Sequence, residues 1–283
     1  MINMNSSKSA GTRTSFSNAV QRLRPGLCFS SLALLIGISA ADPGLHAAPV
    51  SGPPAARVVS AHYQHPASSD LPESRILSRR MVERSDDPPF SVDADVPYLE
   101  GPEPRVQPFN RSVEKLIQGE IERFRPQEGM AVPESSLDIT FQIRFAREGL
   151  ISLLFEVFRV HVGAAHPVSH SRVLNFDLRQ GKPLSLSSLF RPESGYLRAI
   201  AVYAMNELEG QAALQPYTDR AWLEKGAGPR MENYRNWTLT PEGLEITFDP
   251  YQVAAYVAGS QTVLIPWEIL KGLIRPGLPA RNR

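Results

Sequence analysis

Two histidines and one aspartate have the types and spacing that could do metal chemistry. His166 and His170 lie four residues apart in the stretch HPVSH, and Asp249 ends the stretch Thr247–Asp249. Two imidazoles and a carboxylate are ligands that zinc accepts, and a further carboxylate could act as general base. Pro250 stands where that second carboxylate would be expected, so the set is incomplete.

The predicted backbone separates the two histidines. The stretch HPVSHSRVLNF is typical of a turn that leads into a strand, where residues four apart lie roughly 13 Å from each other. Zinc bonds to histidine are only about 2.1 Å long. We therefore expect no metal site, no cofactor and no catalytic residue. A metal-dependent cell-wall hydrolase or deacetylase that uses His166, His170 and Asp249 is the alternative function.

The stretch TFDPYQVAAYVAG predicts a short helix between two strands. Asp249 would cap its start, Pro250 suits the first helical position, and Gly259 would end it. Tyr251 and Tyr256 are five residues apart, which is about 140° around a helix, so both cannot face inward equally. One tyrosine is expected in the core with a bonded hydroxyl, and the other could be exposed and available to a ligand. Of the two interpretations, the one in which both tyrosines are structural is favoured.

The elements around these residues predict an α+β fold, mostly antiparallel, with helices on one face of the sheet and two subdomains. Apolar residues recur at helical spacing in 109–125 and 195–210, and they alternate strictly from Leu137 to Phe145. Acidic pairs are expected on solvated faces. Asp93 and Asp95 would lie on one strand face, where they could assist a cation, and Glu120 and Glu122 on a helix surface. Further strands are expected at 150–162, 168–178, 236–248 and 262–267.

The first 90 residues differ in composition from the rest. Residues 1–41 carry four basic and no acidic residues, then an apolar run and small residues at Ser39–Ala41, which predicts a signal peptide and export to the periplasm or the extracellular space. Membrane contact is expected only if this leader stays uncleaved. Residues 42–90 are rich in Pro, Ser and Ala and predict a disordered linker. Cys28 lies inside the leader, so the mature chain would have no thiol chemistry.

The charge balance excludes one class of partner. The chain has a formal net charge of +1, and removal of residues 1–41 leaves −3. A nucleic-acid-binding protein would need a basic face to neutralise phosphates, so no nucleic-acid partner is expected.

An ordered set of short motifs in the second half of the chain resembles one known family. It runs from Gly-x-x-His-Pro, through Asn-x-Asp and Gly-Lys, to Phe-x-Pro-Tyr-x-Val-Ala-x-Tyr and Ile-Pro, between about Gly163 and Leu273. The pattern is similar to the RsiV-like family, the extracellular domain of the anti-sigma-V factor RsiV. The same module also occurs beside peptidoglycan deacetylase catalytic domains. The matching residues are Gly163, His166, Pro167, Asn175, Asp177, Gly181, Lys182, Leu186, Leu189, Phe190, Gly243, Leu244, Phe248, Pro250, Tyr251, Val253, Ala254, Tyr256, Ile265 and Pro266.

The resemblance implies an exported module that binds rather than catalyses. It divides the globular part into an N-terminal α+β subdomain at 91–162 and an RsiV-like domain at 163–283. The implied partner is a lysozyme-like protein, and a cell-wall glycan is the other possibility, since aromatic faces and planar polar side chains suit sugars. The candidate ligand-binding residues are His166, Asn175, Asp177, Tyr251, Tyr256 and Trp267.

Overall fold

Four stretches of the chain are described by the structure, which is a computed structural model: residues 76–101, 104–125, 135–161 and 163–276. The predicted signal peptide at 1–41 lies outside the described residues, as does the part of the predicted linker up to residue 75.

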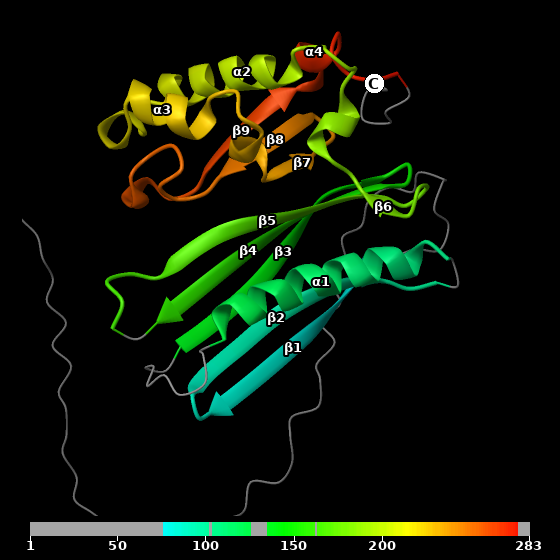
Figure 1. Ribbon diagram of the computed structural model, residues 1–283, viewed down its shortest axis with the longest axis vertical. Coiled ribbons are helices and arrows are strands. Elements are labelled where there is room, and N and C mark those ends of the chain that lie inside the picture. Colours follow the sequence, from blue (N-terminus) through cyan, green and yellow to red (C-terminus); the bar gives the residue numbers. More distant parts are fainter. Residues whose placement is uncertain (1–75, 102–103, 126–134, 162, 277–283) are drawn as a thin grey trace, which may run out of the picture. The chain divides into compact units, whose positions relative to one another are not determined.

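The larger layer is a six-stranded sheet whose strands follow one another in chain order (Figure 1). Neighbouring strands are antiparallel except β2 and β3, which run parallel. The parallel pair arises because helix α1 joins these two strands, and a parallel connection needs such a crossover. The strands are β1 Ile76–Asp86, β2 Pro89–Leu99, β3 Ser135–Arg147, β4 Leu150–His161, β5 Val168–Asp177 and β6 Lys182–Pro183, and the helix is α1 Val106–Phe124.

Strand β1 corrects the prediction that residues 42–90 are all linker. It pairs with β2 along its whole length, from Ile76 opposite Leu99 to Asp86 opposite Pro89. As the first strand in the order of the sheet it has one paired neighbour, and its burial alternates between intermediate and exposed. Its polar composition therefore reflects a half-solvated strand.

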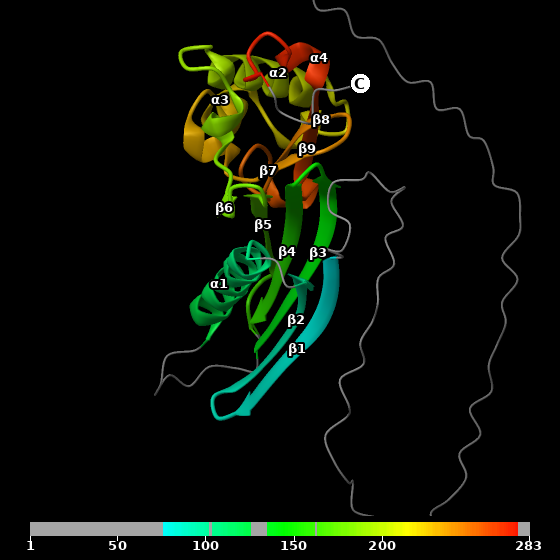
Figure 2. The ribbon, with the colours of Figure 1, turned by 90° about the vertical axis from the view of Figure 1, so that its right-hand side faces the viewer.

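Helix α1 covers one face of the six-stranded sheet through the apolar stripe that the sequence predicts (Figure 2). Its buried residues recur three or four positions apart, so they form one face of the helix. They pack on the inward residues of β2, β3, β4 and β5, among them Leu153 and Phe155. The buried residues of the stripe are Val106, Phe109, Val113, Ile117, Glu120, Ile121 and Phe124.

The smaller layer is a three-stranded antiparallel sheet in the order β7-β8-β9, with helices α2 and α3 on one side of it (Figure 1). Its apolar residues form a second core that includes Ile200, Leu208, Ile246 and Phe248. No helix in the described ranges is long and apolar enough to cross a membrane. The elements are α2 Tyr196–Gly210, α3 Arg220–Ala227, β7 Trp237–Leu239, β8 Gly243–Phe248, β9 Gln261–Pro266 and α4 Trp267–Leu270.

The two cores confirm the α+β fold with two subdomains, but they divide the chain at a different place from the one expected. Strand β5 and Leu178 belong with the six-stranded sheet and its core, whereas Leu186 belongs to the second core. Phe145 and Leu150, beside the β3–β4 turn, also belong to the second core, but the main change of core along the chain falls after β5. The expected boundary at 162/163 would separate β5 from its sheet.

Polar side chains of the larger sheet bind the backbone of β7. The Asn175 side-chain amide donates to the Trp237 carbonyl at 2.7 Å, and the Leu239 N–H donates to the Ser152 hydroxyl at 3.0 Å. Ser152 also donates to Asn175. Because β7 is an end strand of its sheet, its outward backbone groups would otherwise need other partners, and buried groups without one are costly.

Candidate functional site

Three of the six predicted ligand-binding residues come together in one group of rings. We call His166, Tyr251 and Tyr256 the aromatic cluster. The His166 ring stacks on Tyr256 with 4.0 Å between ring centroids, and the Tyr251 and Tyr256 centroids are 5.5 Å apart. The Tyr251 hydroxyl lies 3.4 Å from Nε2 of His166. Residues that are far apart in the sequence thus form a continuous aromatic surface.

The two tyrosines differ in exposure and in the bonding of their hydroxyl groups, but neither belongs to the buried core as the sequence predicts for one of them. Tyr256 is half-buried, and its hydroxyl donates to the Pro167 carbonyl at 2.8 Å. Tyr251 is 55% exposed. Val168 follows Pro167 in the sequence and Val257 follows Tyr256, and both valines are exposed. The cluster therefore exposes the Tyr251 ring to solvent, while the Tyr256 hydroxyl is bonded to the backbone.

The predicted helix at 249–259 is wrong, apart from a single 3-10 turn at Tyr256–Ala258. Tyr251 has a φ of +68°, a left-handed conformation that interrupts a right-handed helix. The Asp249 carboxylate accepts from the Ser171 N–H at 2.7 Å, where the helix prediction required it to cap the next turn. A tertiary contact has therefore replaced the local one that the sequence suggested.

The loop that carries Tyr251 is held by the α3 region. The Trp222 indole N–H donates to the Tyr251 carbonyl at 3.1 Å. The side chain of Gln252 donates to the carbonyls of Gly226 and Asn233, each at 2.9 Å. A non-glycine residue in the left-handed region costs energy, which these bonds offset. The exposed ring of Tyr251 thus projects from a fixed backbone.

The other three predicted residues have structural roles elsewhere. Asn175 and Asp177 are buried, Asn175 in the contact with β7. Asp177 accepts from the N–H groups of Arg179 and Gln180 in the turn after β5. Burial would raise the pKa of Asp177, but hydrogen bonds from Arg179 and Gln180 lower it overall. Trp267 packs against the second core and donates its indole N–H to the backbone at 3.1 Å.

Replacement of Asn175 by alanine is expected to lower the free energy of unfolding by about 2 kcal/mol. The substitution leaves a buried carbonyl of β7 and a buried hydroxyl without their hydrogen-bond partner. Chemical denaturation measures the change. Asn206 is exposed on α2, so Asn206→Ala is the control and should stay within about 0.5 kcal/mol of the wild type. Equal effects of the two substitutions would contradict the assigned role of Asn175.

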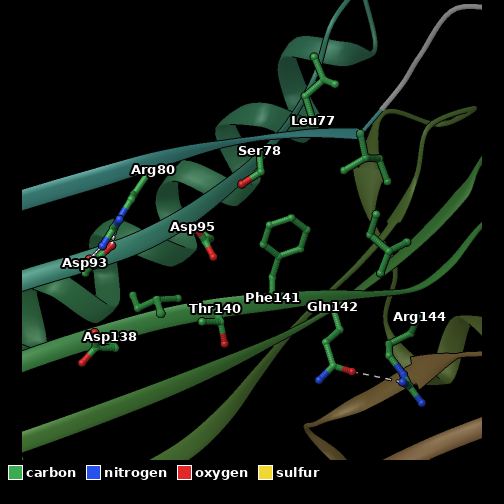
Figure 3. Close-up of a pocket in the computed structure, with 13 residues that line it drawn as sticks. Leu77, Ser78, Arg80, Asp93, Asp95, Asp138, Thr140, Phe141, Gln142 and Arg144 are labelled. Atoms are coloured by element: carbon green, nitrogen blue, oxygen red, sulfur yellow. Dashed lines mark hydrogen bonds and ion pairs between the residues drawn. The ribbon is translucent and has the colours of Figure 1, made fainter. Parts of the chain in front are cut away.

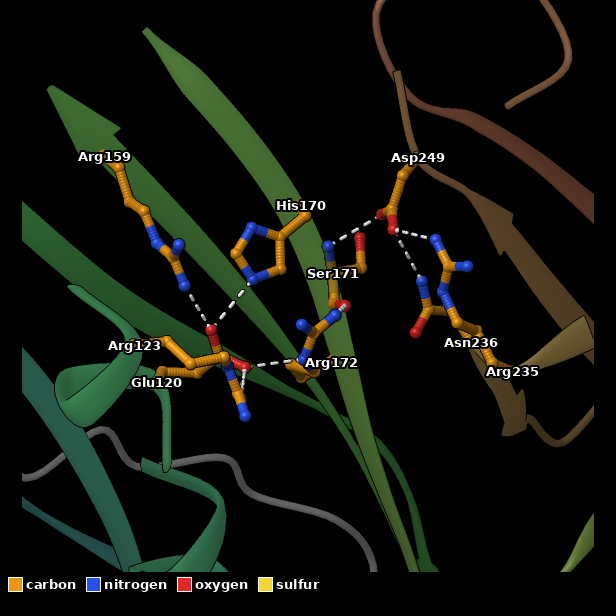
Figure 4. Close-up of polar contacts among 9 residues, drawn as sticks. All are labelled: Glu120, Arg123, Arg159, His170, Ser171, Arg172, Arg235, Asn236 and Asp249. Carbon is orange, nitrogen blue, oxygen red and sulfur yellow. Dashed lines mark hydrogen bonds and ion pairs between the residues drawn. The ribbon is translucent and has the colours of Figure 1, made fainter. Parts of the chain in front are cut away.

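Glu120, for which a solvated helix surface is expected from the sequence, is a buried carboxylate with several charged partners. Glu120 on α1 has a side chain that is 0% exposed and is surrounded by four basic side chains (Figure 4). Arg172 Nε donates to it at 2.6 Å, one terminal nitrogen of Arg159 at 2.7 Å and His170 Nε2 at 2.9 Å, and Arg123 completes the group. We call these five residues the Glu120 cluster.

The charges around Glu120 explain its ionisation. Burial alone would raise the pKa of this carboxyl group. The hydrogen bonds from His170 and Arg123 and the charge of Arg172 outweigh burial and hold its pKa far below the ordinary value. Glu120 has the same helical spacing as the buried residues Ile117 and Ile121, so the sequence pattern could have predicted that its side chain points inward. The pattern could not have predicted its partners on β4 and β5.

The arrangement that the metal alternative requires is not formed by the proposed residues. His170 binds Glu120 on the α1 side of β5, whereas Asp249 binds the neighbouring Ser171 from the other side of the strand (Figure 4). His166 stacks on Tyr256 in the aromatic cluster. Within the described residues, no group of three or more His, Cys, Asp or Glu side chains is placed to hold a metal ion.

Part of the chain is similar to a known protein family. Residues 187–268 match the family model described as "Protein of unknown function (DUF3298)". The chain thus carries a DUF3298 region, which includes both tyrosines of the aromatic cluster but not His166. A crystal structure of a DUF3298 family protein from Pseudomonas aeruginosa is similar with a TM-score of 0.48 and 18% identity, over 73% of this chain and 96% of that chain.

Two characterised relatives match at low identity. The peptidoglycan-N-acetylmuramic acid deacetylase PdaC of Bacillus subtilis is 22% identical over 172 residues, 59% of this chain and 36% of that protein. The chain therefore spans about a third of the deacetylase's length. The immunogenic protein MPT64 of Mycobacterium tuberculosis is 21% identical over 194 residues, 66% of this chain and 79% of that protein.

Proposed function

We propose that this protein is an exported, non-catalytic binding module of the cell envelope, and that the aromatic cluster is its contact surface for a lysozyme-like protein. The observation that carries the proposal is the exposed, backbone-fixed ring of Tyr251 beside Tyr256 and His166. Rigid tyrosines supply a large contact area at a low entropic cost, and residues of this type dominate the binding energy of protein interfaces.

The location and the non-catalytic role rest on sequence likeness. The predicted signal peptide at 1–41 supports export, and similarity to a protein named as a peptidoglycan deacetylase supports an envelope setting. The resemblance to the RsiV-like family supports lysozyme as the kind of partner. The separation of His170 from Asp249 on opposite sides of β5 supports binding over metal-dependent catalysis.

A protein partner fits the surface better than a cell-wall glycan does. A glycan site needs planar polar side chains beside the aromatic faces, and Asn175 and Asp177 were the candidates for that role. Both side chains are buried and engaged in structural bonds. Exposed apolar side chains lie next to the cluster residues in the sequence, namely Val168 and Val257, and apolar side chains suit the core of a protein interface.

Removal of the Tyr251 ring is expected to weaken binding to hen lysozyme at least 10-fold, with little effect on folding. Tyr251→Gly is the preferred substitution because glycine adopts a positive φ freely, so the loop keeps its shape while the ring is lost. The free energy of unfolding should stay within about 1 kcal/mol of the wild type. Binding is measured by surface plasmon resonance with immobilised lysozyme.

The control is Tyr98→Ala, which removes a half-buried ring from β2 in the other subdomain. It should leave lysozyme binding unchanged. If the wild-type chain binds purified peptidoglycan but not lysozyme, and Tyr251→Gly abolishes that binding, the glycan assignment replaces the protein one. Binding of neither ligand by the wild type would refute the proposed function.

A further inference from the structure

A cleft opens where strands β2 and β3 separate, and it is distinct from the aromatic cluster. The two strands pair only from Phe90–Ala94 to Ser135–Ile139. Beyond this point β2 continues to Leu99 and β3 to Arg147. The space between them is a cavity of about 770 Å³, into which Asp95 and Phe141 point (Figure 3). We call it the β2–β3 cleft.

One wall of the cleft is an open strand edge. Beyond Ile139, the described residues provide no strand that pairs with β3 on the side away from β4. Successive residues of an extended strand direct their N–H and C=O groups alternately to one side and the other. From Thr140 onward, β3 therefore presents backbone groups to the cleft that no strand in the described ranges pairs. A bulge between Ile143 and Phe145 ends the regular stretch. The open edge is thus about five residues, or roughly 17 Å, long.

The opposite wall is partly closed. At the end of β2, the side chain of Asn110 accepts from the Leu99 N–H at 2.8 Å and donates to the Leu99 carbonyl at 3.0 Å. Pro97 has no N–H to offer. A segment in the cleft would therefore pair mainly with β3, as a strand added to an open edge does.

The side chains of the cleft differ between the two faces of the sheet. Phe141 and Ile143 are partly buried against the α1 core and give an apolar face. Asp138 and Thr140 alternate with them along β3 and are exposed. An added strand would therefore meet apolar groups with one set of alternate residues and polar groups with the other.

Three carboxylates and two arginines line the cleft, and both arginines are paired. Arg144 forms an ion pair with Glu245, and Nε of Arg80 donates to Asp93 at 2.7 Å. Asp95 and Asp138 also line the cavity, and neither side chain forms a hydrogen bond or ion pair with any residue in the described ranges. The charges of both carboxylates nevertheless act on Arg80, so they lie within electrostatic reach of the same region. Two unpaired carboxylates at one cleft favour a cationic occupant.

From the open edge and the two faces, we propose that the β2–β3 cleft binds an extended segment of a partner protein in which basic and apolar residues alternate. The segment adds a strand to β3 between Thr140 and Arg144. Its apolar side chains contact Phe141 and Ile143, and its basic side chains face Asp95 and Asp138. This site does not depend on the aromatic cluster or on lysozyme.

The test uses the full chain and three synthetic octapeptides of equal length. The first consists of four Val-Lys repeats, the second of four valines followed by four lysines, and the third of four Val-Glu repeats. Binding is followed by amide NMR titration, which detects weak complexes. The alternating basic peptide should bind at least 10-fold more tightly than either of the other two, and amides between Thr140 and Arg144 should gain protection from hydrogen exchange at alternate positions.

Two matched double variants separate the acidic face from general charge. Asp95→Asn/Asp138→Asn should weaken binding of the Val-Lys peptide about 3- to 10-fold. Asp86→Asn/Asp87→Asn removes the same charge at the exposed tip of the β1–β2 hairpin. This control should change the affinity for the Val-Lys peptide less than 2-fold. Equal binding of the alternating and block peptides, or binding without protection at 140–144, would overturn the proposal.

Discussion

Replacement of Glu120 by glutamine is expected to lower the free energy of unfolding by about 3 kcal/mol at pH 7. Removal of one partner from a buried ion-pair network leaves the charges of the remaining partners uncompensated, and this typically costs roughly 3–5 kcal/mol. Arg159 and Arg172 retain some exposure, with 18% and 32% of their side chains accessible, so part of the cost is recovered through hydration. The change is measured by urea denaturation of the folded chain.

The same variant should show a distinct dependence on pH. The folded-state pKa of Glu120 lies below its ordinary value of 4.5, so the ionised form stabilises the folded protein. This contribution is fully present above about pH 5 and is lost as the pH falls below 4.5 toward the folded pKa. The difference in unfolding free energy between wild type and Glu120→Gln should therefore be constant from pH 8 to 5 and shrink below pH 4.5.

Glu122→Gln provides the control for the loss of charge on α1. Glu122 is exposed and two residues from Glu120. This substitution should change stability by less than about 0.5 kcal/mol at all these pH values. The assigned role of the Glu120 cluster would be refuted if both variants behaved alike, or if the difference between Glu120→Gln and the wild type grew in acid.

Replacement of Gly226 by alanine is expected to destabilise the fold by at least about 3 kcal/mol. A Cβ atom at this position of α3 would lie 1.8 Å from the backbone carbonyl oxygen of Gln252. Backbone cannot move aside as the tip of a side chain can, so α3 and the loop that carries Tyr251 must separate. Thermal and chemical unfolding measure the loss, and lysozyme binding should fall even where the variant is still folded.

Gly119→Ala on α1 is the matched control, because an added Cβ there meets only the end of the Arg123 side chain at 3.7 Å. Alanine is the better helix former, so this variant should gain about 0.5–1 kcal/mol. A neutral effect of Gly226→Ala would show that α3 and the Tyr251 loop do not approach each other as closely as described.

The periodicity of apolar residues in the sequence was sufficient to predict most of the helices and strands. The alternation from Leu137 to Phe145 lies within β3, and the stripe from Phe109 to Phe124 lies within α1. These patterns depend on one buried face each, which the chain encodes locally. Strand β1 was missed because its burial is incomplete on both faces, so its composition resembles that of a linker.

The candidate site was predictable only in part, for a different physical reason. The types of His166, Tyr251 and Tyr256 indicated a ligand surface, and the structure brings these rings together. Asn175 and Glu120 depend on partners in other strands, which no local pattern reveals. The expected helix at 249–259 is absent, and the Asp249 carboxylate that would have capped it binds a backbone group of β5, although the backbone of Asp249 still bonds to Gln252.

The contact between Asp249 and β5 has a consequence for how such proteins can diverge. The aspartate binds the main-chain N–H of Ser171, so every amino acid except proline could occupy position 171 and still supply that donor. The same holds for Trp237, whose main-chain carbonyl receives Asn175. The hydrogen bonds themselves therefore constrain the side chain of only one member of each pair, and packing alone restricts the other position, since Ser171 and Trp237 are both buried.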